Sequence, residues 1–149
     1  MKRKLIALFA TIVVAAVFAV SCGKLNVKPV VEEGTNGDLI AVYLFVTDEY
    51  YSGEEMKLSA YMDAVKEAGK FGYETTEGAY GAYLTTVNGR AADATKNEFW
   101  SLYTSNEEYN GEFGENYEYN GTTLYPASLG MDSLPVKTGE TIMFILMTY

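Results

Sequence analysis

The order of apolar and polar positions predicts several strands and one helix between residues 38 and 149. Leu39–Val46 is an apolar run rich in β-branched and aromatic residues, long enough for one buried strand. Thr141–Tyr149 is apolar on both of its faces, which is the pattern of a central strand. Phe71–Thr75 indicates a shorter strand between them. Several strands with a single helix predict an α+β domain, in which the helix packs on one face of a mixed sheet.

The predicted helix covers residues 60–68. Ser59 is a residue type that caps helix starts, and Gly69 is typical of helix ends. The apolar stripe at helical spacing consists of Tyr61, Ala64, Val65 and Ala68. We expect this stripe to pack on the sheet. Asp63 and Glu67 are then interpreted as the solvated side of the helix and not as a catalytic carboxylate pair.

The stretch Tyr80–Tyr103 has the pattern of a β-hairpin. Its first half is rich in aromatic and β-branched residues and stops at an Asn-Gly pair, Asn88 and Gly89, which favours a turn. Its second half carries the single tryptophan of the chain, Trp100. We therefore predict one hairpin with a polar loop.

Neighbouring side chains of a strand point to opposite faces, so Phe99 and Trp100 should be separated by the sheet. Trp100, Leu102 and Thr104 would share one face, and Phe99, Ser101 and Tyr103 the other. Two interpretations of Trp100 stay open, a core residue or a ring that stacks on a planar ligand.

The first 22 residues have the pattern of an export signal. Lys2, Arg3 and Lys4 precede an apolar run from Leu5 to Val20, which resembles the n- and h-regions of a signal peptide. The sixteen residues of this run are fewer than the ~20 needed to span a bilayer, although an uncleaved anchor is the alternative. The sequence around Cys22 resembles a bacterial lipobox, so we expect residues 1–21 to be removed and Cys22 to be lipidated.

Residues 22–37 are then predicted to form a lipidated N-terminus and tether, followed by one domain at residues 38–149. Without the signal the chain holds eight basic and twenty acidic residues, a net charge of −12. Such a surface repels anionic lipid, so we expect membrane contact through the lipid anchor alone. The protein should therefore lie at the bacterial cell surface, outside the cytoplasm.

The composition narrows the chemistry. The chain of 149 residues contains no histidine and one cysteine, and its net charge is −9. Histidine is the commonest general base and transition-metal ligand, so its absence excludes histidine-dependent nucleophile systems and most zinc sites. A phosphate backbone requires a basic footprint, which argues against nucleic acid as a partner. We expect a protein that is not an enzyme and holds no metal.

Residues 105–129 form an acidic, tyrosine-rich segment. Its acidic part, Ser105–Gly121, has five glutamates and lacks the spacing of a calcium loop. We predict a mobile loop or a small exposed hairpin. Its tyrosines could form a surface for a protein or a glycan, or serve only as spacing residues. These tyrosines are Tyr109, Tyr117, Tyr119 and Tyr125.

Three blocks in order carry a resemblance to a known family. Tyr80–Ala92, Glu98–Leu102 and Thr138–Ile142 look like the small C-terminal β-domain of transcobalamin and intrinsic factor, which also occurs in stand-alone bacterial lipoproteins. The similarity spans roughly residues 38–149. It implies a β-grasp-like fold with one main helix on the sheet. In the cobalamin carriers this domain covers one face of the corrinoid, while a larger helical domain holds the other face.

The resemblance implies a non-enzymatic protein that binds a small ligand, a corrinoid such as cobalamin being the candidate. The ligand would stack on Trp100 and its aromatic neighbours, and threonine hydroxyls would bond its periphery. The expected ligand-binding residues are Tyr83, Thr85, Thr86, Trp100, Leu102 and Tyr103. No helical domain precedes this chain's domain, so a partner protein would complete the site. Thr85 and Thr86 are equally ordinary strand residues, and an adhesion module using the acidic segment is the alternative function.

Overall fold

The computed structural model describes residues 30–34, 41–47, 56–69, 71–79 and 81–149. Its helices and strands are β1 (Val30–Gly34), β2 (Ala41–Val46), β3 (Met56–Lys57), α1 (Leu58–Glu67), β4 (Tyr73–Gly78), β5 (Gly81–Val87), β6 (Arg90–Ala91), η1 (Ala94–Lys96), β7 (Glu98–Thr104), η2 (Glu107–Tyr109), β8 (Tyr117–Tyr119), β9 (Thr122–Pro126), β10 (Pro135–Val136) and β11 (Thr141–Thr148). The domain is of the α+β class, as predicted. The pairings among these strands are all antiparallel, which differs from the expected mixed sheet.

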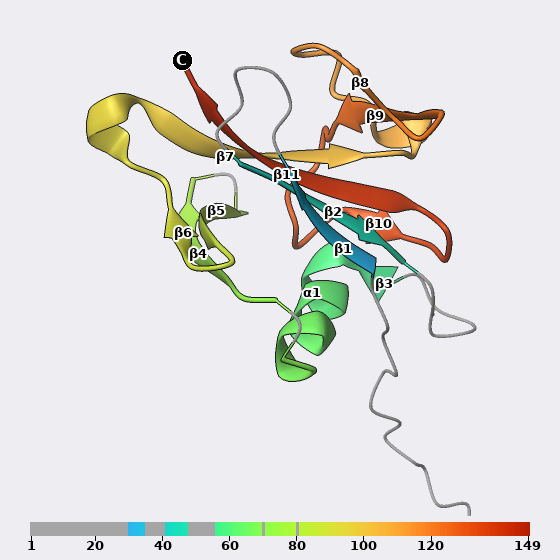
Figure 1. The fold of residues 1–149 in the computed structure, drawn as a ribbon, viewed down its shortest axis with the longest axis horizontal. Helices are drawn as coiled ribbons and strands as arrows, with labels where there is room; N and C mark the ends of the chain where they lie inside the picture. Colours follow the sequence, from blue (N-terminus) through green and yellow to red (C-terminus); the bar gives the residue numbers. More distant parts are fainter. Residues whose placement is uncertain (1–29, 35–40, 48–55, 70, 80) are drawn as a thin grey trace, which may run out of the picture.

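The largest sheet has six strands in the order β1-β2-β11-β7-β9-β8 (Figure 1). β11 lies inside it and pairs with β2 on one side and β7 on the other. Residues 141–146 of β11 are buried on both faces, which confirms the prediction of a central strand. A smaller sheet, β4-β5-β6, stands beside it, and β3 pairs with β10 near the start of the helix.

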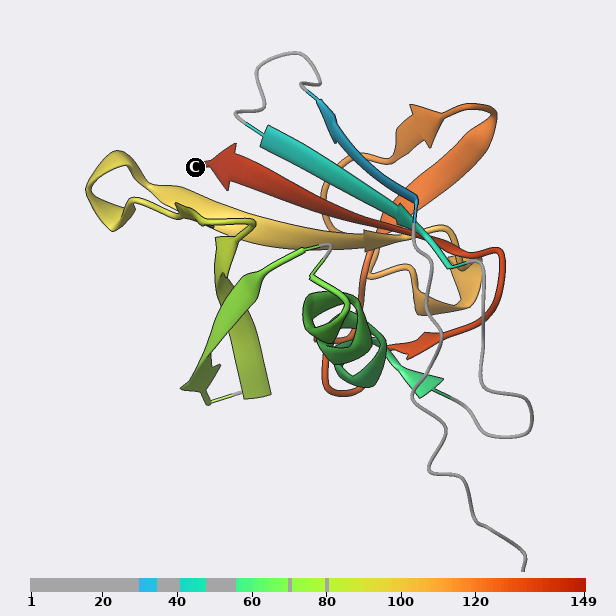
Figure 2. The same cartoon turned by 60° about the horizontal axis from the view of Figure 1, so that its bottom comes forward.

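The main core lies between α1 and one face of the six-stranded sheet (Figure 2). Alternate side chains of β11, from Ile142, Phe144 and Leu146, enter this core and are fully buried. Tyr61 and Val65 of α1 meet them there. Burial of each side chain of this size stabilises the fold by roughly 1.5–3 kcal/mol.

The helix starts differently from the prediction. α1 begins at Leu58, so Ser59 lies within its first turn, and its N-cap position is Lys57, without a side-chain cap. Backbone carbonyls take over the role of a cap, because the N–H of Leu58 donates to the Leu134 carbonyl (2.8 Å) and the N–H of Ser59 to the Met131 carbonyl (3.0 Å). The start of α1 therefore anchors the loop that contains Met131.

The solvated side of the helix is as predicted. Asp63 and Glu67 are both exposed. Asp63 accepts a hydrogen bond of 2.5 Å from the Tyr73 hydroxyl, which ties β4 to α1. The buried stripe consists of Leu58, Tyr61, Met62 and Val65, and Ala68 is exposed at the helix end.

The hairpin predicted over Tyr80–Tyr103 is wrong. β5 pairs with β4 and β6, whereas β7 pairs with β11 and β9, so the two halves belong to different sheets. Asn88 and Gly89 do form the expected turn, with φ of 46° and 80°. After that turn β6 has two residues, and the chain then crosses through η1 to the larger sheet.

The second face of the large sheet carries a smaller core. Its members are Leu44, Tyr103, Leu124, Met143 and Ile145, with Tyr117 and Tyr119 of the β8–β9 region packed against them. Figure 1 shows β8 and β9 at the end of the sheet opposite the β4-β5-β6 unit. β8 and β9 form the small hairpin predicted within the acidic segment, but this hairpin packs against the sheet and its Leu124 is fully buried, so the prediction that it is exposed is wrong.

Several predictions concern residues outside this described part. They are the signal peptide at 1–21, the lipidation of Cys22, most of the tether at 22–37, and the first residues of the strand predicted from Leu39. Within the expected tether, Val30–Gly34 forms β1 and pairs with β2 along its whole length. No helix of the described residues is long and apolar enough to span a bilayer.

Candidate functional site

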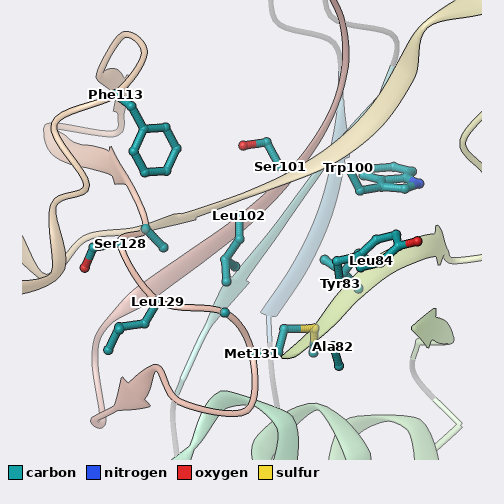
Figure 3. A pocket seen from close by; sticks show the side chains of 12 residues that line it. Ala82, Tyr83, Leu84, Trp100, Ser101, Leu102, Phe113, Ser128, Leu129 and Met131 are labelled. Carbon is teal, nitrogen blue, oxygen red and sulfur yellow. The ribbon is translucent and has the colours of Figure 1, made fainter. Parts of the chain in front are cut away.

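A pocket of about 240 Å³ lies where β5, β7 and the loop after β9 approach one another (Figure 3). Three consecutive runs, residues 82–84, 100–102 and 127–131, line it together with Phe113. None of these lining side chains is charged. The pocket therefore suits a neutral or apolar group, and Tyr83, Ser101 and Ser128 are the lining residues that carry hydroxyls.

Trp100 forms part of the pocket wall but is mainly a core residue. It is 7% exposed, whereas Phe99 is 37% exposed, so the two side chains lie on opposite faces as predicted. The Trp100 indole N–H donates to the Arg90 carbonyl (3.0 Å), and the ring lies 5.9 Å from the ring of Tyr43. Of the two interpretations, the core role fits this burial. Leu102, two residues along β7, also lines the pocket.

Among the residues that line the pocket, the most exposed aromatic rings are those of Tyr83 and Phe113, each 56% exposed. Figure 3 places them on opposite sides of β7, with Leu102 between them. Each ring lies against a glycine. A Cβ added to Gly78 would lie 3.0 Å from the Tyr83 ring, and one added to Gly111 would lie 2.1 Å from the Phe113 ring. A side chain at Gly111 would displace the Phe113 ring, and one at Gly78 would push the Tyr83 ring by a few tenths of an ångström, so each ring packs where a glycine leaves room for it.

The loop that carries Phe113 is held by backbone hydrogen bonds. The N–H of Gly111 donates to the Pro126 carbonyl (2.7 Å), and the N–H of Glu112 donates to Oδ1 of Asn110 (2.9 Å). Glu112 has a φ of 55°, a left-handed conformation that turns the chain. Phe113 is thus presented to solvent by an ordered turn.

The loop at residues 127–131 closes the pocket floor. The N–H of Ser128 donates to the Tyr109 carbonyl (2.8 Å), and the start of α1 holds the Met131 carbonyl. Met131 is 2% exposed and belongs to the main core. This wall is therefore fixed from both of its ends.

Glu98 joins the two sheets beside the pocket. Its side chain is 3% exposed, and its carboxylate accepts hydrogen bonds from Nη2 of Arg90 (2.9 and 3.0 Å) and from the Asp93 N–H (2.9 Å). Arg90 belongs to β6 and Glu98 to β7. The ion pair thus fixes the small sheet against the large one.

Thr85 and Thr86 do not line the pocket. The hydroxyl of Thr85 donates to the Glu74 carbonyl (3.3 Å), and that of Thr86 donates to the Glu74 carboxylate (3.1 Å). Both hydroxyls support the β4–β5 pairing, next to a β-bulge between Glu74 and Thr75. Their proximity to Glu74 fits the ordinary strand role.

Tyr103 lies across the sheet from Trp100 and Leu102, in the smaller core. It is 2% exposed, and its ring meets that of Tyr117 at 5.2 Å, edge to face. Burial, with Tyr117 and Glu115 nearby, raises the pKa of Tyr103 to about 12. The alternation of side chains along β7 separates Tyr103 from the pocket, so it is not brought together with the other expected site residues.

This raised pKa predicts an alkaline loss of stability. Below pH 10 Tyr103 is neutral in both states. Between pH 10 and 12 the unfolded chain releases the proton and the folded chain keeps it, so the free energy of unfolding falls by about 2 kcal/mol. Urea unfolding at pH 9 and at pH 11.5 measures the fall. Tyr103→Phe should show a smaller fall, and an identical fall in that variant would contradict the assignment.

The tyrosines of the acidic segment are half-buried and not an open surface. Tyr109 packs against the main core, and Tyr117 and Tyr119 pack against the smaller one. The contribution of this segment to the pocket is Phe113, which the sequence analysis did not single out. The sequence signal for it is slight: Phe113 stands between Glu112 and Gly114 in a polar stretch, where no apolar periodicity predicts a buried position.

Among the described residues, no three carboxylate or thiol groups lie close enough to hold a metal ion. Comparison with models of known protein families gives no match, and a search of curated proteins gives none either. The pocket, with its two rings, is accordingly the feature from which a function can be argued.

Proposed function

We propose that this chain is a non-enzymatic binding protein that takes part of a small ligand into the pocket between β5 and β7. The observation that carries the proposal is the pair of exposed rings, Tyr83 and Phe113, each positioned by a glycine beside an uncharged pocket. Exposed aromatic rings lose hydration when a ligand covers them, and they pack on planar groups.

The ligand class comes from the resemblance to the β-domain of the cobalamin carriers. A corrinoid is broad, flat and neutral over most of its surface, which suits two spaced rings and an uncharged pocket. The antiparallel sheet with α1 on one face is compatible with a β-grasp-like fold, the finer assignment that the resemblance suggests.

The proposed site is one half of a complete one. Pockets that enclose a drug-sized ligand have volumes of roughly 300–1,000 Å³, and this pocket has about 240 Å³. The ligand would therefore be covered on one side only. A partner protein would cover the other side, as the helical domain does in the carriers.

Titration of the purified protein with cobinamide and with cobalamin, followed by Trp100 fluorescence and by calorimetry, tests the proposal. We expect Tyr83→Ala and Phe113→Ala each to weaken binding about tenfold, because each removes one stacking surface. Phe99→Ala is the matched control: it removes an exposed ring outside the pocket and should leave the affinity unchanged. Absence of quenching and of heat at millimolar ligand would refute the proposal.

We also propose that Cys22 carries a lipid and holds the protein at the outer cell surface. The lipobox-like sequence before Cys22 supports this. Cys22→Ser should move the protein from the membrane fraction to the soluble fraction, since no other lipid attachment is proposed. A variant that stays with the membrane would instead support an uncleaved anchor.

A second candidate function is an interaction module for a protein partner. One observation favours it: the acidic segment supplies Phe113 to the pocket. Deletion of residues 105–129 is not a clean test, because it removes the fully buried Leu124 and strands β8 and β9. Phe113→Ala, which spares the core, is the appropriate variant.

A further inference from the structure

The edge of β7 that faces the pocket lacks a neighbouring strand over part of its length. β7 pairs with β11 from Glu98 to Thr104, but with β9 only at Tyr103 and Thr104. The Tyr149 N–H donates to the Asn97 carbonyl (3.3 Å). In an antiparallel pair this means that the backbone N–H and C=O groups of Asn97, and of every second residue after it, point toward β11. The backbone groups of Glu98, Trp100, Leu102 and Thr104 therefore point to the other edge.

Two of these four residues have partners on that edge that agree with this assignment. The Glu98 N–H donates to the Asp93 carbonyl (3.1 Å), and the Leu102 carbonyl accepts from the Ala127 N–H (2.9 Å). For Trp100, the described residues provide no hydrogen bond to the backbone N–H or C=O. If β9 continued in the same register, Leu129 would lie opposite Trp100. After Ala127, however, the segment that follows β9 no longer pairs with β7.

The lining of the pocket has the character of a strand edge. Side chains alternate between the faces of a strand, so a face contributes every second residue, whereas an edge contributes consecutive residues. Residues 100–102 and 82–84 line the pocket as consecutive runs. The pocket thus lies between the edges of β7 and β5, which belong to different sheets.

The surroundings of the pocket are acidic. Glu77 is paired with Ala82, Glu112 precedes Phe113 and Asp132 follows Met131, and all three side chains are exposed. No charged residue among those described lines the pocket itself, and Arg90, whose carbonyl accepts the Trp100 indole N–H, is paired with Glu98. An occupant with positive charges near its ends would therefore be attracted to this rim.

We infer that the free edge of β7 at Trp100 accepts an extended, positively charged peptide of a partner protein as an added strand. The inference rests on the second proposed function, an interaction module. The peptide runs where β9 would have continued, and its backbone bonds the N–H and C=O of Trp100. Its apolar side chains contact Leu102 and Met131, and its basic ends lie near the acidic rim.

A defined probe is the synthetic peptide acetyl-Lys-Val-Tyr-Val-Lys-amide, together with peptides in which the central residue is varied among apolar and aromatic types. The readout is amide-resolved hydrogen exchange of the full chain, kept in detergent. The Trp100 N–H should exchange about tenfold more slowly at nine-tenths saturation, because exchange then proceeds from the free fraction. The Ser101 N–H, which points to β11, should not change.

Matched controls separate strand addition from simple adhesion. A peptide N-methylated along its backbone should bind about tenfold more weakly, since it has lost its donors. A peptide with glutamate in place of lysine should also bind more weakly. Glu112→Lys should weaken the basic peptide about threefold, whereas Glu67→Lys, on the solvated side of α1, should not.

The outcomes distinguish this inference from the proposed small-ligand function. Unchanged Trp100 exchange with every basic peptide at millimolar concentration would overturn the strand-addition site, even if cobinamide bound. Slowed Trp100 exchange without any cobinamide binding would support it and refute the small-ligand proposal. Equal binding of the N-methylated and unmodified peptides would also overturn it.

Discussion

Replacing Phe144 with alanine should lower the free energy of unfolding by about 4 kcal/mol. Phe144 is fully buried in β11, the strand that joins β2 to β7. Its ring stacks on that of Phe71, with centroids 6.1 Å apart and an interplanar angle of 11°. The substitution removes this contact and leaves a cavity between sheet and helix, where the surrounding backbone cannot fully collapse.

Urea unfolding at pH 7, followed by circular dichroism, measures the effect. Phe99→Ala in the neighbouring strand is the matched control. Phe99 is 37% exposed, so its loss should cost less than about 1 kcal/mol. Equal costs for the two variants would mean that β11 is not the centre of the core.

The second large effect is expected at Glu98. Glu98→Gln removes the charge that Arg90 and the Asp93 N–H share, and the free energy of unfolding should fall by about 2 kcal/mol. The cost is smaller than for a fully buried pair, because the Arg90 side chain is 39% exposed and water can compensate it. The small sheet should also loosen against β7, with weaker ligand binding as a result.

A double-mutant cycle with Arg90→Met isolates the pair, and a coupling of about 1 kcal/mol is expected. Lys96→Met is the control, because the Lys96–Asp93 pair is mostly exposed, at 66% and 34%, and should contribute less than about 0.5 kcal/mol. If the coupling free energy of Glu98 and Arg90 were no larger than the contribution of the Lys96–Asp93 pair, the role of Glu98 in joining the two sheets would be contradicted.

The sequence predicted local patterns well and long-range pairing poorly. The central character of β11, the opposite faces of Phe99 and Trp100, and the turn at Asn88 and Gly89 all follow from periodicity and turn chemistry within a few residues. The predicted hairpin failed because the partner of a strand is chosen by distant segments. Nothing near Trp100 in the sequence indicates that β11, some forty residues later, pairs with it.

The candidate site was predicted in part for the same reason. Tyr83, Trp100 and Leu102 were expected and line the pocket, because they belong to strands recognisable from their composition. Phe113 and Met131 come from loops, and their place depends on contacts with Pro126 and with the start of α1. Tyr103 was expected at the site although alternation already placed it on the opposite face from Trp100 and Leu102, because which face of β7 is open depends on its pairing with distant strands.

The proposal that the pocket between β5 and β7 is the ligand site is tested most directly by chemical-shift mapping of the isotope-labelled protein with cobinamide. We predict that the largest amide shifts fall at residues 82–84, 100–102 and 127–131 and at Phe113, and that they vanish in a variant carrying both Tyr83→Ala and Phe113→Ala. Saturable shifts confined to residues outside these runs, or shifts that persist in the double variant, would contradict it.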